Sequence, residues 1–160
     1  MSESAGSAPP ELLYFEDVQV GQRFHSGPYT VRAAEIRAFA AQFDPQPFHL
    51  DEQAARGSLF GGLVASGWHT AAITMRLSLE AGPRFAAGTV GLGADVTWQR
   101  PVRADDTLHV QVEVIDKVAS ESKPDRGRVV MRIETRNQRG EVAQVLIPRV
   151  WVPRRAAASA

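Results

Sequence analysis

The stretch "SGWHTAAITMRLSLEAG", residues 66–82, says most about how this chain folds. Apolar side chains occur on almost every side of the helix it would form, and its two charged residues, Arg76 and Glu80, are spaced to pair with each other. Ser66 is a suitable N-cap, and the Gly-Pro pair at 82–83 is a stop signal. Because a helix that is apolar on most faces is usually buried, the stretch predicts a long helix inside the core.

After this helix the apolar residues recur with a period of two. Three segments, residues 90–98, 107–116 and 128–137, alternate apolar and polar side chains, and a fourth, residues 142–152, is a more apolar strand. Their connections are short and rich in turn residues, whereas parallel neighbours need crossovers of about a dozen residues. The pattern predicts an α+β domain in which an antiparallel sheet wraps around the long central helix. In the first segment, the face expected to point toward the core consists of Val90, Leu92, Ala94, Val96 and Trp98.

The first third of the chain contains shorter elements. Residues 22–31 predict an extended segment broken by a Gly-Pro turn, and residues 33–43 predict an amphipathic helix. Pro45 ends that helix, because the residue before a proline avoids the helical region. Residues 52–56 predict a short helix, with Asp51 as its N-cap.

Composition excludes several classes of protein. The 160 residues suit one domain, expected at 12–153 between disordered tails at 1–11 and 154–160. A net charge of zero with no Lys/Arg run argues against a nucleic-acid partner, and no apolar stretch is long enough to span a membrane. The chain has no cysteine, which excludes disulfides, a cysteine nucleophile and thiolate metal sites. With no signal-peptide pattern at the N-terminus, we expect a cytoplasmic protein.

The hexapeptide "DPQPFH", residues 44–49, is the first candidate site. Two prolines stiffen the connection between Asp44 and His49, so the two side chains can be held in a fixed relation. A carboxylate and an imidazole that meet on one water form a general acid/base arrangement. The alternative is that Asp44 caps a turn and His49 is a half-buried ring.

The start of the long helix is the second candidate. A helix that opens with Ser66-Gly67 offers unpaired N–H groups, and a glycine there lets a ligand approach the backbone closely. An oxyanion formed from a carbonyl would be stabilised by these N–H groups. The alternative is that Ser66 is an ordinary N-cap with no role in binding. His69 lies close to this point and is a candidate to bind acyl carbonyl or phosphate groups. The alternative is that it is a partly buried histidine at the start of the helix. No metal site is expected, because no His-x-x-x-His and no carboxylate cluster occurs.

Together these motifs resemble one known family. "FDPQPFHLDEQAA", followed by "GGLVASGW" and "QRPVRADDTL", is similar to the signature and order of parts of the MaoC-like dehydratases, the R-specific enoyl-CoA hydratases. Asp44, Pro47, His49 and Ala55 match that signature, and the resemblance covers residues 15–152. It implies a single hotdog domain, usually paired into a homodimer.

The resemblance also implies an activity. Asp44 and His49 would activate a water that adds to a trans-2-enoyl thioester of coenzyme A or acyl-carrier protein, giving an (R)-3-hydroxyacyl product. The Gly67 N–H would bind the thioester oxygen as it gains enolate charge. Coenzyme A is part of the substrate, and no cofactor is implied. The other residues expected near the substrate are Ser66, Gln46, Trp68 and His69.

Two departures from the family pattern and two competing functions remain. Gln46 replaces the usual asparagine, and Thr70 and Ala72 stand where some members have a serine. A thioesterase of the same fold, or a non-catalytic acyl-CoA-binding subunit, would share the architecture. The intact Asp44 and His49 argue against both. The acyl tunnel would be lined by some of Phe60, Trp68, Met75 and Phe85.

Overall fold

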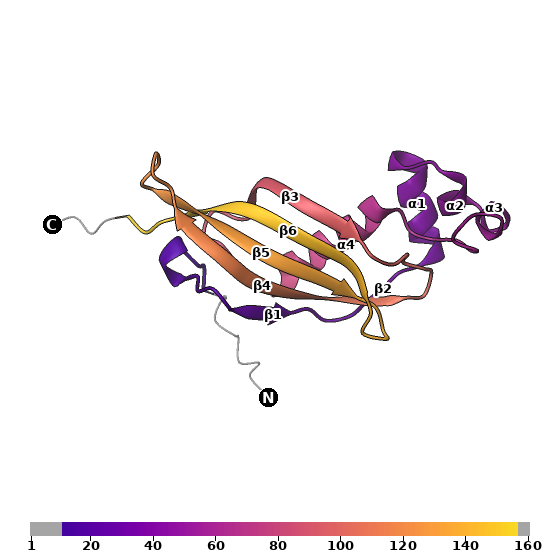
Figure 1. The fold of residues 1–160 in the computed structure, drawn as a ribbon, viewed down its shortest axis with the longest axis horizontal. Helices are drawn as coiled ribbons and strands as arrows, with labels where there is room; N and C mark the ends of the chain where they lie inside the picture. The colour runs from indigo at the N-terminus through magenta and orange to yellow at the C-terminus, as the bar shows by residue number, and fades with distance from the viewer. Residues whose placement is uncertain (1–10, 157–160) are drawn as a thin grey trace, which may run out of the picture.

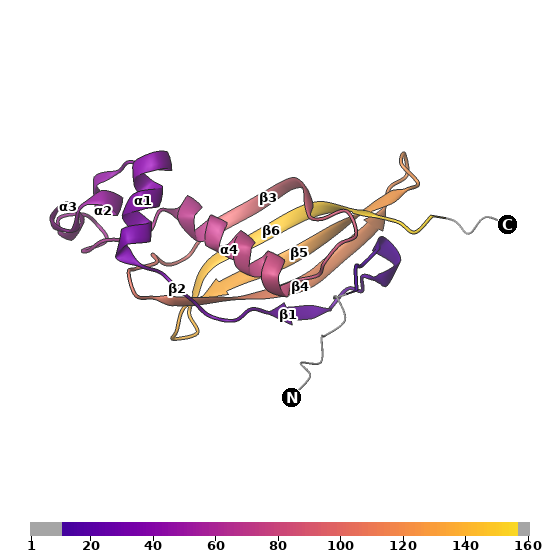
Figure 2. The same ribbon diagram turned by 180° about the vertical axis from the view of Figure 1, so that it is seen from behind.

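In the computed structural model, which describes residues 11–156, one long helix lies along one face of a six-stranded sheet (Figures 1 and 2). Every strand pair is antiparallel, as predicted. Across the sheet the order is β1 (Arg23–His25), β4 (Thr107–Ala119), β5 (Arg126–Arg136), β6 (Val142–Pro153) and β3 (Val90–Trp98), and β2 (Tyr29–Thr30) pairs with the start of β4.

The long helix is α4 (Gly67–Ala81), and it begins where the sequence predicts. The Ser66 hydroxyl accepts a hydrogen bond from the Trp68 N–H at 3.2 Å, so Ser66 is the N-cap. α4 packs mainly on β4, β5 and β6. Ile73 and Leu77 of α4 belong to the same buried cluster as the inward side chains of those strands, which include Leu108, Val110, Val112, Val129, Ile133 and Val150.

The prediction that α4 is covered on most sides is wrong. Trp68, Met75 and Leu79 are exposed by 60%, 43% and 52%. The predicted inward face of β3 is also largely exposed, and only Val96 on it is half-buried. One reason is that α4 packs mainly on β4, β5 and β6, so it leaves β3 uncovered. A second is a β-bulge between Gly91 and Gly93, which breaks the alternation and pairs Val90 with Trp151. We use the name apolar band for the exposed apolar residues of these two elements: Trp68, Met75 and Leu79 on α4, and Val90 and Leu92 on β3.

Three helices lie together beyond one end of the sheet, close to the start of α4 (Figure 1). They are α1 (Ala33–Phe43), α2 (Pro47–Leu50) and α3 (Glu52–Arg56). α1 and α3 have the predicted bounds, and the Asp51 carboxylate caps α3 by accepting from the Ala54 N–H at 2.7 Å. His49 was expected before a helix, but it lies inside α2, which starts at Pro47 because a proline needs no N–H partner in a first turn.

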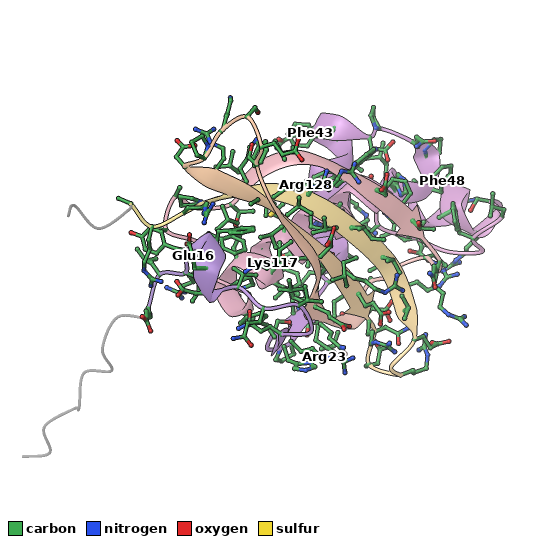
Figure 3. The ribbon with its side chains drawn as sticks, turned by 60° about the vertical axis from the view of Figure 1, so that its left-hand side comes forward. Glu16, Arg23, Phe43, Phe48, Lys117 and Arg128 are labelled. Carbon is green, nitrogen blue, oxygen red and sulfur yellow. The ribbon has the colours of Figure 1, made fainter. Side chains whose placement is uncertain are left out.

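The opposite end of the molecule carries η1 (Phe15–Asp17); Figure 3 shows Glu16 there, far from Phe48 on α2. Arg154, which the sequence assigned to a tail, pairs with Glu16 at 2.9 Å, and Arg155 pairs with Asp17 at 2.6 Å. The rest of the expected tails, residues 1–10 and 157–160, lies outside the described residues. None of the helices in the described part of the chain is long and apolar enough to cross a membrane.

Candidate functional site

The proline-stiffened hexapeptide brings Asp44 and His49 into contact. Asp44 is the C-cap of α1, and His49 lies one short turn further on in α2. Their side chains approach with His49 Nε2 3.2 Å from Asp44 Oδ2. The His49 side chain is almost fully buried, while that of Asp44 is partly open. The pair therefore has the geometry needed to act together on a proton.

The second ring nitrogen of His49 fixes how the ring is protonated. His49 Nδ1 lies 2.7 Å from the Val64 carbonyl oxygen. A carbonyl only accepts hydrogen bonds, so Nδ1 carries a proton and donates it. Nε2 is then the nitrogen that gains or loses a proton, and it is the one that faces Asp44. Sequence reasoning missed Val64, because a backbone carbonyl gives no side-chain signal.

Asp44 is surrounded by groups that favour its ionised form. The Ser66 hydroxyl, the amide of Gln46 and the nearby His49 ring together hold the pKa of the Asp44 carboxyl below its usual value, although partial burial acts against them. Gln46 Nε2 donates to Asp44 Oδ1 at 2.6 Å, so the longer glutamine side chain reaches this carboxylate. Asp44 is consequently a carboxylate across the neutral pH range.

The start of α4 faces the same cavity as the Asp44–His49 pair. This cavity has a volume of about 570 Å³, and Asp44, Gln46, His49, Gly67 and Trp68 all line it. Gly67 is the first residue of the helix, where backbone N–H groups have no partner within the helix. An acid/base pair and a helix N-terminus thus border one space large enough for a small organic group.

Glycine is required at position 67. A Cβ built on Gly67 would lie 2.5 Å from Cε2 of Trp98, closer than side chains approach in folded proteins. The indole of Trp98 therefore packs directly on the backbone of the first turn. Any side chain here would push the turn or the ring away from its position.

His69 does not line this cavity, which corrects its expected place near the substrate. Two residues after Gly67 it points about 200° around the helix, toward α1. There its ring stacks on Phe39 with centroids 4.8 Å apart, and no hydrogen-bond partner contacts its Nδ1 within the described structure. Burial lowers the pKa of His69, so the ring is neutral at neutral pH. Thr70, in contrast, lines the cavity, and Ala72 lies on the exposed side of α4.

A second cavity lies further along α4. It has a volume of about 290 Å³ and is lined mostly by apolar side chains from α4 and the sheet. Of the four residues expected to line an acyl tunnel, Phe60 and Trp68 line the first cavity, and Met75 and Phe85 line the second.

The first cavity has further lining residues that sequence reasoning did not assign to it. Trp98 was placed on a core face, yet it stands at the cavity wall beside Phe48 and residues 99–102. The signal that was available is a tryptophan at the end of an edge strand, since its ring combines an apolar face with one N–H donor. In the part of the chain that the structure describes, no group of three or more His, Asp or Glu side chains is arranged to hold a metal ion.

An antiparallel sheet carrying one long helix, with an Asp–His pair facing the start of that helix, defines a hotdog domain of the hydratase and dehydratase type. Residues 17–136 match the family model described as the MaoC like domain, and the chain belongs to that family.

Individual relatives agree with this assignment. The MaoC-like dehydratase from Rhodospirillum rubrum is 54% identical, with 91% of this chain and 99% of that one aligned at a TM-score of 0.87. The R-hydratase PhaJ1 from Pseudomonas aeruginosa is 25% identical over 92% of both chains, with a TM-score of 0.71. The 3-hydroxybutyryl-CoA dehydratase of Methylorubrum extorquens is 34% identical over 127 residues, which cover 74% of this chain and 73% of that protein.

Proposed function

We propose that the protein hydrates trans-2-enoyl thioesters to (R)-3-hydroxyacyl thioesters, and catalyses the reverse dehydration. The observation that carries the proposal is the contact of 3.2 Å between His49 Nε2 and Asp44 Oδ2 beside the N-terminus of α4. The named activities of two relatives, a 3-hydroxybutyryl-CoA dehydratase and an R-hydratase, support both the substrate class and the stereochemistry.

The proposed reaction moves one proton and forms one C–O bond. Asp44 and His49 both contact one water in the cavity and take one of its protons as its oxygen attacks C3. The C2=C3 electron pair moves toward the thioester oxygen, and the Gly67 N–H stabilises the enolate that forms. The Asp44–His49 pair then returns the proton to C2. One water is consumed and nothing is oxidised or reduced, so no redox cofactor enters the reaction.

The remaining features suit a thioester with an apolar chain. The second cavity offers apolar space on the same helix, and we propose that it takes the longer acyl groups. Coenzyme A or an acyl-carrier protein would carry the thioester. We further propose that the protein works as a homodimer, because large apolar side chains on both α4 and β3 are more than 40% exposed and exposed apolar surface is typical of interaction sites.

The test is loss of the enoyl-thioester absorbance when the protein meets crotonyl-CoA and longer 2-enoyl-CoAs. We expect turnover by the unchanged protein, and a fall in kcat of about 10²-fold or more for Asp44→Asn, since general acid–base catalysis contributes that much. Free thiol is followed in the same reaction. Release of thiol without loss of the double bond would mean a thioesterase, and tight binding without either change would mean a non-catalytic subunit.

A further inference from the structure

A chain of hydrogen bonds, buried where it lies between α4 and the sheet, connects the sheet to the first turn of α4. Trp98 Nε1 donates to the Gly67 carbonyl oxygen at 3.0 Å and to Gln144 Oε1 at 2.9 Å. Gln144 Nε2 donates to Thr74 Oγ1 at 2.9 Å, and Thr135 Oγ1 lies 2.6 Å from the same hydroxyl. Gln144, Thr74 and Thr135 are all completely buried.

The direction of every bond in this chain is determined. An indole nitrogen can only donate, so the amide oxygen of Gln144 must face Trp98 and its NH₂ must face Thr74. The Thr74 hydroxyl donates its one proton to the Thr70 carbonyl oxygen, at 2.8 Å. Thr135 must therefore donate to Thr74. Because all these groups are satisfied in one arrangement only, the chain holds the indole of Trp98 in one orientation.

Apolar residues would hold α4 on the sheet as well, and without the cost of burying polar groups. What they would lack is a donor for the Gly67 carbonyl. The Gly67 carbonyl and the Trp68 N–H belong to one peptide unit, and that N–H donates to the Ser66 hydroxyl. The chain of contacts that begins at Gln144 thus reaches Ser66 and Gly67 at the start of α4, and Gly67 lines the same cavity as Asp44 and His49. The Ser66 hydroxyl also lowers the pKa of the Asp44 carboxyl.

We propose that Trp98 and Gln144 are positioning residues for the reaction. The indole of Trp98 packs against Gly67 and donates a hydrogen bond to its carbonyl oxygen. Together these two contacts fix the direction of the Gly67 N–H relative to the carboxylate of Asp44. Gln144 acts through Trp98 and touches no substrate. This inference rests on the proposed function, since it assigns a task within that same site.

The experiment compares Trp98→Phe, Gln144→Met and the double variant with the unchanged protein. Each single change removes one partner of the Trp98–Gln144 bond: phenylalanine keeps an aromatic ring at position 98, and methionine has nearly the length and shape of glutamine at position 144. Trp151→Phe is the matched control, because it makes the same replacement on β6 opposite Val90, at the other end of β3. Two measurements are made: steady-state kinetics with crotonyl-CoA, and amide hydrogen exchange of residues 67–71.

We expect each single change to lower kcat roughly 10-fold, with KM changed less than about twofold, because small misplacements at a reacting centre cost rate rather than binding. The double variant should be no slower than the slower single variant, since the two residues act as a unit. Exchange at the first turn should rise in Trp98→Phe, and Trp151→Phe should resemble the unchanged protein in both measurements.

Two results would overturn the inference: normal kcat and normal amide protection in Trp98→Phe, or effects of the single changes that multiply in the double variant. An unchanged protein that turns over no enoyl thioester would instead refute the proposed function. The hydrogen-exchange comparison would then still decide whether Trp98 anchors the first turn.

Discussion

At the scale of single residues, Asp44 is the most closely defined group in the molecule. It accepts a hydrogen bond from Gln46 at 2.6 Å and faces Nε2 of His49 at 3.2 Å, and the Ser66 hydroxyl acts on its pKa as well. All three groups favour the carboxylate, so the pKa of Asp44 lies below the ordinary 3.8. A general base that is already ionised at neutral pH needs no further activation there.

This environment predicts the pH dependence of activity. Because the pKa of Asp44 is lowered, kcat/KM should fall only as the pH drops below the ordinary range of an aspartate. Gln46→Met removes one donor to the carboxylate, so the pKa of Asp44 should rise and the acid limb of kcat/KM should move to higher pH. At pH 7, where both proteins keep Asp44 ionised, kcat/KM should differ less than about threefold, as expected for the loss of one hydrogen bond.

The pH profiles are measured with circular dichroism at each pH, so that acid unfolding is recognised. Gln22→Met, on an exposed turn remote in sequence from the site, is the control and should leave the profile unchanged. Acid limbs that coincide for Gln46→Met and the unchanged protein would show that Gln46 does not support the carboxylate.

Sequence reasoning finds residues of this kind only where the signal is local. Asp44 and His49 are five positions apart and stiffened by prolines, so their contact can be predicted. The Val64 carbonyl that orients His49 is fifteen positions away and belongs to the backbone, and Trp98 reaches Gly67 from 31 positions away. Such contacts exist only once the chain has folded.

At the scale of elements, α4 is fixed to the sheet by a hydroxyl as well as by apolar packing. Thr74 lies on the buried face of α4 and binds both Thr135 on β5 and Gln144 on β6. Replacing it by an isosteric apolar residue would keep the shape of the core. The hydroxyl of Thr135 and the amide of Gln144 would, however, lose a partner in a place that water does not reach.

Thr74→Val should therefore lower the free energy of unfolding by about 1–3 kcal/mol, the usual cost of a buried polar group left without its partner. Chemical denaturation at constant pH measures the change. Thr97→Val, the same replacement at an exposed position of β3, should be nearly neutral. Equal stability of Thr74→Val and the unchanged protein would mean that the network contributes nothing to holding α4.

The elements show where local pattern is sufficient and where it fails. The bounds of α1 and α4 follow from helical periodicity and capping residues, and the long strands follow from alternation. Alternation also identifies the apolar residues of β3, but it misses the β-bulge between Gly91 and Gly93, which puts Val90 on the other face from Ala94 and Val96, and it cannot say what covers the strand. In the structure α4 packs mainly on β4, β5 and β6. β3 therefore stays exposed, although its apolar residues follow the pattern of a strand that faces the core.

At the scale of the whole molecule, the apolar band determines how two chains would meet. It includes residues of α4 and of β3, which is an edge strand within residues 11–156, and an edge strand with apolar side chains is a template for pairing. A second copy would cover both at once and extend the sheet across the interface. Related strands in the two copies would then lie next to each other.

We expect the unchanged protein to elute with twice the mass of one chain in size-exclusion chromatography with light scattering. Met75→Glu and Leu92→Glu each place a charge within the band, on α4 and on β3, and should shift the protein toward the mass of one chain. Val20→Glu, at an exposed apolar position in a turn outside the band, should keep the dimer. Dimers that persist in both band variants would place the contact on another surface.

The packing of Trp98 on Gly67 also limits the order in which related sequences can diverge. A side chain gained at position 67 clashes with the indole ring at once, whereas a smaller residue at position 98 creates no such clash with Gly67. Replacement must therefore begin at position 98, and only afterwards does position 67 become free to change. Positions 67 and 98, which are 31 residues apart, should therefore change together in related sequences, and the change at position 98 should come first.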